Sequence, residues 1–201
     1  MNNNRNNDSI TINEVLCRVN EFILNLDTII QVSCGPGSEG LITIDSLDAE
    51  LNGAAIIIDT ITSGISGCQD GCPAGSTSDT ISPDGKQASI LFDAFLAEAN
   101  GNIPDQSFVE KCCSIGLEFL PDEPNKKQII QFDITFRGFV DLPQECFANL
   151  FVNANNILTF NGPVSQDYRA NITVNVILGC PPNPQITITN QNITAIVFET
   201  G

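Results

Sequence analysis

Eight cysteines carry the most distinctive chemistry of this chain: Cys17, Cys34, Cys68, Cys72, Cys112, Cys113, Cys146 and Cys180. An even number spread over the whole length favours disulfides formed in an oxidising environment. Cys68 and Cys72 are separated by three residues, and Cys112 and Cys113 are adjacent. Neither spacing matches the two-residue knuckles of zinc or iron–sulfur sites. We therefore expect disulfides, with no metal and no cofactor.

The sequence leaves the disulfide partners open. A bond between neighbouring residues strains the backbone, so Cys112 and Cys113 should reach two different partners. We take Cys17, Cys112 and Cys113 as candidates for disulfides between chains, because Cys17 lies near an amino-terminal arm that can cross an interface. The other disulfide candidates are Cys34, Cys68, Cys72, Cys146 and Cys180. The alternative, in which all eight pair within one chain, stays open.

Catalytic chemistry is poorly supported. The chain has no histidine, which excludes Ser-His-Asp and Cys-His arrangements and removes the usual general base. Paired carboxylates could cleave glycosidic bonds, and the candidates on or beside strands are Asp45, Asp48, Asp59, Asp93 and Glu118. Sugar-cleaving sites also use aromatic platforms, yet this chain has no tryptophan and one tyrosine. We expect no enzyme.

Two other groups of residues have side chains of types that can bind a ligand. Three loop aspartates, Asp70, Asp79 and Asp84, suggest only a weak calcium site because no EF-hand spacing exists. The phenylalanines are dispersed and are assigned to the core rather than to a ligand platform: Phe92, Phe95, Phe108, Phe119 and the 147–151 region.

The charge balance excludes some partners. Asp and Glu total 24 against 8 Lys and Arg, which gives a formal charge of −16. Nucleic-acid affinity comes mainly from Lys and Arg, so we exclude nucleic acid and anionic membrane surfaces. The polar surface is instead rich in amides and hydroxyls, which can be buried against a partner more cheaply than charges. This composition favours packing of protein on protein.

Most of the chain has the pattern of β-strands. Residues 128–140 and 168–178 alternate apolar and polar side chains with period two. Residues 54–62 form a continuous Ile-rich run, which is typical of a strand covered on both faces. Short strands separated by Pro and Gly turns predict an all-β protein, a β-sandwich or jelly roll.

The amino-terminal part is predicted to differ. Val15, Val19, Phe22 and Leu26 recur at helical spacing after a possible N-cap at Asn13, so residues 1–27 are assigned to a short helix or arm. Residues 10–12 look extended, so a strand that runs into this region is the alternative. Residues 28–201 then form the sandwich. A weak echo of the Ile-Thr-Ile segments at 42–44 and 186–188 is compatible with two related halves, about 28–106 and 107–201, and equally with chance.

The leader gives a conflicting signal about location. Residues 1–8 are polar, no apolar h-region follows them, and so no secretory signal is visible. Residues 22–32 are interrupted by polar side chains and should not enter a membrane. We expect a cell or spore surface in an oxidising environment, either with oxidation after assembly or with an original leader missing.

A leaderless, Asn-led, cysteine-bearing, histidine-free β protein resembles the structural proteins of the bacterial endospore surface: coat, exosporium and spore-appendage subunits. That resemblance implies synthesis in the mother cell followed by disulfide cross-linking. It also implies a jelly-roll subunit whose arm, here residues 10–19 with Cys17, bonds to neighbouring subunits.

The function predicted from these observations is a self-assembling structural surface subunit that is cross-linked by disulfides. Its partners are copies of itself, in a homo-oligomer or polymer, or other surface structural proteins. One alternative is an extracellular β-sandwich module that recognises a polymer or a partner protein. Another is a phage or virus structural protein.

Overall fold

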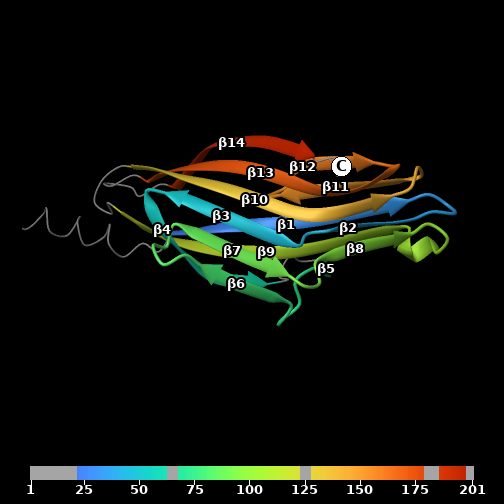
Figure 1. Ribbon diagram of the computed structural model, residues 1–201, viewed down its shortest axis with the longest axis horizontal. Helices are drawn as coiled ribbons and strands as arrows, with labels where there is room; N and C mark the ends of the chain where they lie inside the picture. Colours follow the sequence, from blue (N-terminus) through green and yellow to red (C-terminus); the bar gives the residue numbers. More distant parts are fainter. Residues whose placement is uncertain (1–21, 63–67, 123–127, 179–185, 198–201) are drawn as a thin grey trace, which may run out of the picture.

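The computed structural model describes residues 22–62, 68–122, 128–178 and 186–197. In these residues there is no α-helix, and a single 3-10 turn lies at Pro104–Gln106. No helix there has the length and apolarity needed to span a bilayer. The strands run along the long axis of the molecule (Figure 1) and form two antiparallel sheets packed face to face, which confirms the predicted all-β sandwich.

The six-stranded sheet has the order β12-β11-β1-β9-β4, with the short β5 paired to β9. Its strands are β1 (Phe22–Cys34), β4 (Ala54–Thr62), β5 (Gln69–Asp70), β9 (Phe108–Pro121), β11 (Cys146–Val152) and β12 (Asn155–Asn161). The eight-stranded sheet has the order β14-β13-β10-β3-β7-β6, and β2 joins β10 to β8. Its strands are β2 (Glu39–Thr43), β3 (Ser46–Asn52), β6 (Thr77–Ile81), β7 (Gln87–Phe92), β8 (Leu96–Asn100), β10 (Gln128–Leu142), β13 (Val164–Leu178) and β14 (Ile186–Val197).

The core lies between the sheets, where alternate side chains of each strand meet. Phe119 of β9 packs edge-on against Phe132 of β10, with ring centroids 5.1 Å apart. Phe160 of β12 packs against Tyr168 of β13 at 5.2 Å. Because these pairs join strands of different sheets, each fixes the distance and the register between the layers.

Tyr168 also ties its strand to β2. Its hydroxyl donates a hydrogen bond of 2.5 Å to the Thr43 carbonyl oxygen. Burial, and secondly the negative charge of Asp45, raise the pKa of this phenol well above its usual value. The backbone of β2 approaches so closely here that a Cβ at Gly138 would collide with the Thr43 carbonyl oxygen, so the position requires glycine.

The predicted amino-terminal helix is wrong where it can be compared. Residues 22–26 begin β1, which pairs with β9 from Phe22 onward. Leu24 and Leu26 are buried while Asn25 is exposed, so the period is two and continues to Cys34. Residues 14–21 of that prediction lie outside the described residues. The expected boundary after residue 27 falls inside β1.

Both proposed halves contribute strands to both sheets. In the six-stranded sheet, β1 lies between β11 and β9, and in the other sheet β10 pairs with β3. The two Ile-Thr-Ile segments also differ in setting, because the first lies mainly in β2 and the second is the start of the long strand β14. The chain therefore forms one interleaved sandwich.

Candidate interaction surface

Three disulfides join segments far apart in the sequence. Cys34 bonds to Cys146, its direct cross-strand partner on β11, with Cα atoms 4.1 Å apart. Cys68 bonds to Cys112 with Cα atoms 5.9 Å apart, and Cys72 bonds to Cys113 at 5.5 Å. These bonds are consistent with an oxidising, extracellular location.

Cys112 and Cys113 reach two different partners, but both partners lie in the same chain, which corrects their assignment as intermolecular candidates. Successive residues of a strand point to opposite faces. Cys113 therefore meets Cys72 in the core, while Cys112 meets Cys68 on the outer side of the sheet. Cys17 and Cys180 lie outside the described residues, so the intermolecular role of Cys17 stays a prediction.

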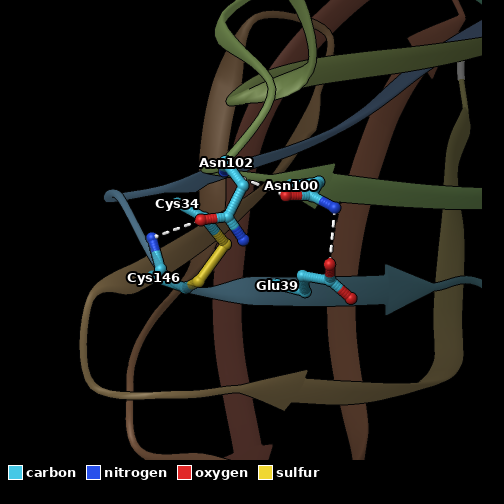
Figure 2. The surroundings of a disulfide bond; sticks show 6 residues. Cys34, Glu39, Asn100, Asn102 and Cys146 are labelled. Carbon is cyan, nitrogen blue, oxygen red and sulfur yellow. Dashed lines mark hydrogen bonds between the residues drawn. A yellow bond between two sulfur atoms is a disulfide. The ribbon is translucent and has the colours of Figure 1, made fainter.

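The Cys34–Cys146 bond lies at one end of the sandwich, where several turns meet (Figure 2). The Asn102 side chain accepts a hydrogen bond of 3.0 Å from the Gly37 N–H. The Asn102 N–H donates to the Asn100 side chain at 2.9 Å, and the Asn100 amide donates to Glu39 at 2.5 Å. The disulfide and this chain of hydrogen bonds fix the end of β1 against its neighbours.

The carboxylates considered for catalysis are not gathered in one cleft in the described part of the chain. Asp48 faces a shallow groove of about 460 Å³ on the outside of the eight-stranded sheet, together with Glu50 and Asp133. Asp48 accepts hydrogen bonds from Ser89 at 2.7 Å and from Arg137 at 3.2 Å. Asp45, Asp59, Asp93 and Glu118 do not line this groove.

Asp133 is also held by its neighbours in the sheet. It accepts from Thr173 at 2.6 Å and from Gln131 at 2.8 Å. Glu50, its direct cross-strand neighbour, is exposed. These carboxylates form a solvated polar ladder rather than a buried acid and base pair of the kind that glycosidases use.

Among the described residues, one set of side chains has the spacing of a metal site: Cys68, Glu110 and Cys112, whose ligand atoms lie within 4.8 Å of one another. Because the two sulfurs are bonded to each other, neither is a thiolate that could bind a metal. The three aspartates weighed for calcium do not come together. Asp84 instead closes a turn, and the hydrogen bond from Ser82, followed by that from the Lys86 N–H, lowers its pKa.

Two phenylalanines assigned to the core are instead exposed on the outer face of the six-stranded sheet. Phe92, Phe95 and Phe119 are buried, but Phe108 is 51% exposed and Phe147 is 44% exposed. Phe108 is the first residue of β9 and Phe147 the second residue of β11, and both side chains point outward. Because successive residues of a strand point to opposite faces, both rings can be placed once it is known that Cys146 and Cys113 point into the core. The sequence does not show which residues of a strand point inward.

Strand β4 also differs from expectation. The Ile-rich run was predicted to be covered on both faces, yet β4 is the edge strand of its sheet and Ile57 is 37% exposed. Ile56, Ile58 and Ile61 face the core. The run reads as covered on both faces because the outward residue Ile57, between the inward Ile56 and Ile58, is itself apolar. The bulge between Ile58 and Thr60 then brings Ile61 onto the core face.

A family model described as "Domain of unknown function (DUF4360)" matches residues 55–195. A protein of Arthroderma benhamiae, described as an uncharacterized secreted protein, is 24% identical over 135 residues, which cover 60% of this chain and 54% of that protein. The chain thus spans about half the length of this relative.

Proposed function

The chain belongs to the DUF4360 family of domains of unknown function, and we propose that it is a secreted structural subunit that associates with copies of itself through the free edge of β4. Secretion is supported by the secreted relative and by the three disulfides. The observation that carries self-association is the edge of β4, which no other strand of the described residues pairs with from Ile57 to Thr62.

The first part of this edge is covered by the turn before β7. The Ile56 N–H donates to the Gly85 carbonyl oxygen at 2.7 Å, and Lys86 Nζ donates to the Ala54 carbonyl oxygen at 2.8 Å. From Ile57 to Thr62 the strand pairs with β9 alone within the described part of the chain. Unpaired backbone N–H and C=O groups on such an edge are a template for another strand.

Soluble proteins usually protect edge strands with lysine, proline, charge or a bulge. The protection of residues 57–62 is confined to one position, where the charged Asp59 coincides with the bulge; the segment contains neither lysine nor proline, and the residues on either side of Asp59 are uncharged. The net charge of the whole chain is −16, so two copies repel each other over most of their surfaces. A nearly uncharged edge is therefore the place where a second copy can approach, and antiparallel pairing of two identical edges gives a closed two-fold dimer.

The test places a charge on this edge. Ile57→Lys should abolish the concentration-dependent dimer seen by sedimentation velocity, because a lysine opposite its own copy repels and disfavours pairing. Leu91→Lys is the matched control, since Leu91 is exposed on β7, an interior strand of the other sheet. A wild-type protein that stays monomeric at every concentration would exclude this function.

Covalent locking of the assembly is a separate step. With Cys112 and Cys113 bonded internally, Cys17 is the remaining candidate for a bond between subunits. A ladder on a non-reducing denaturing gel that Cys17→Ser removes would support it, whereas a single monomer band would limit assembly to edge pairing. The spore-surface setting and the absence of catalysis stay predictions.

A further inference from the structure

We propose that the outer face of the six-stranded sheet, at its disulfide-bonded end, binds a neutral, extended β-1,4-linked polysaccharide. The observation is a row of four residues directly opposite one another on neighbouring strands: Phe108, Ser33, Phe147 and Asn161. The two exposed phenylalanines flank the small Ser33, so both rings can be reached from solvent across a low, flat floor.

The spacing of the two rings suits a sugar polymer. Phe108 and Phe147 lie on β9 and β11, which are separated only by β1. Two strand spacings place them about 10 Å apart, close to the length of one disaccharide unit of an extended β-1,4-linked chain. In such a chain, alternate sugar rings present the same apolar C–H face, and each can pack on one phenylalanine ring.

A second row supplies polar contacts for the hydroxyl groups of the sugars. It runs parallel to the first, two residues further along the strands, and consists of Glu110, Gln31, Asn149 and Thr159. The Gln31 amide donates to Glu110 at 2.5 Å, and the Thr159 hydroxyl donates to Asn149 at 2.8 Å. These bonds hold the side chains in place, so little conformational entropy is lost on binding.

Charge selects the polymer class. The two rows contain a single carboxylate, Glu110, on a protein whose net charge is −16. An anionic polysaccharide would be repelled by the protein as a whole, whereas a neutral one is not. The chain has no tryptophan, so phenylalanine is the aromatic platform available to it.

The Cys34–Cys146 disulfide holds this surface in shape. Cys34 follows Ser33 and Cys146 precedes Phe147, so the bond joins the two strands on the core side, directly beneath the aromatic row. A Cβ at Gly40 would lie 3.1 Å from both sulfurs, which shows how tightly β2 packs under them. The cross-link fixes β11 with Phe147 against β1, and backbone pairing, including the Cys34 N–H that donates to the Ser107 carbonyl oxygen at 2.9 Å, holds Phe108 on the other side of β1.

The experiment is sedimentation of the oxidised protein with microcrystalline cellulose, with granular starch, an α-linked polymer of different shape, as the geometric control. We expect binding to cellulose and not to starch. Phe108→Ser and Phe147→Ser should each weaken binding about two- to tenfold, the effect of losing one aromatic contact, and the double variant should weaken it by the product. Leu120→Ser, which removes an equally exposed apolar side chain from the far end of β9, should bind like wild type.

Three results would overturn the proposal: no binding of the wild type to cellulose, equal binding to starch, or undiminished binding of the phenylalanine variants. Because both side chains are exposed, urea midpoints should confirm that the variants are folded. If the variants lose dimerisation and the protein never binds cellulose, this face is a contact between copies. Ile57→Lys alters the other surface, so failure of edge pairing is separately visible.

Discussion

Removal of the Cys34–Cys146 disulfide should destabilise the protein more than removal of the Cys72–Cys113 disulfide, because the first bond closes the larger loop. The Cys34–Cys146 bond closes a loop of 112 residues, within which the other two bonds lie, 44 and 41 residues apart in sequence. We compare two variants, Cys34→Ala with Cys146→Ala and Cys72→Ala with Cys113→Ala. Both are made in a background where Cys17 and Cys180 are alanine, so that the remaining six cysteines are those of the three described bridges.

The magnitudes follow from the loop that each bond closes when the others are present. With Cys68–Cys112 intact, the shortest covalent path from Cys34 to Cys146 covers about 70 residues, which corresponds to about 4.4 kcal/mol of restraint on the unfolded chain. Through the Cys68–Cys112 bond, Cys72 and Cys113 are already only about 5 residues apart along the covalent chain. Their own bond therefore contributes about 2 kcal/mol. The first variant should therefore lose about 2 kcal/mol more than the second.

Effects on the folded state largely cancel in this comparison. All four replaced sulfurs are buried, with exposed fractions of 5% or less, so alanine leaves similar cavities in both variants. The assay is equilibrium unfolding in guanidinium chloride without reductant. The denaturant slope m should also rise more in the first variant, because the larger released loop exposes more surface. Equal losses, or a larger loss for the Cys72 and Cys113 variant, would refute the nested-loop reasoning.

Three further predictions concern the core. Gly138→Ala should cost at least about 2 kcal/mol in urea unfolding, because the new Cβ collides with the Thr43 carbonyl oxygen; an unchanged midpoint contradicts this. Thr28 is fully buried and its hydroxyl has no hydrogen-bond partner among the described residues, so Thr28→Val should stabilise by about 1 kcal/mol while Thr28→Ser should not. Tyr168 ionises in the unfolded chain near pH 10 but at higher pH in the folded one. Stability should therefore fall above pH 10, and tyrosinate absorbance, which reports this single tyrosine, should rise only with unfolding.

The sandwich could be predicted because its longest strands alternate strictly. In β10, Ile130, Phe132, Ile134 and Phe136 are buried, as their period-two spacing indicates. The start of β1 was misread because Phe22 and Leu26 also fit a helical spacing. Pairing with β9 decides in favour of the strand, and such tertiary pairing is not encoded in the local pattern.

The disulfide partners and the exposure of two phenylalanines could not be predicted from the sequence for a related reason. Cys112 and Cys113 point to opposite faces of β9, so their partners depend on where the loop containing Cys68 and Cys72 crosses the sheet. Whether Phe108 faces the core depends on the phase of the whole strand and on which sheet covers it. Both properties arise from sheet packing at long sequence separation, which composition and spacing cannot supply.

The two proposed surfaces reinforce each other through the geometry of the sheet. Antiparallel pairing of two β4 edges would extend the six-stranded sheet across a two-fold axis perpendicular to it, and this operation keeps the outer faces of both copies on the same side. The aromatic rows that include Phe108 and Phe147 would then lie on one continuous face and meet the same polymer surface. Once the aromatic row of one subunit is bound, the aromatic row of its partner subunit meets the polymer at a high effective concentration. A dimer therefore holds an insoluble polymer far more tightly than a monomer does. Edge pairing and polymer binding would thus be coupled, although no residue of β4 belongs to either polymer-binding row.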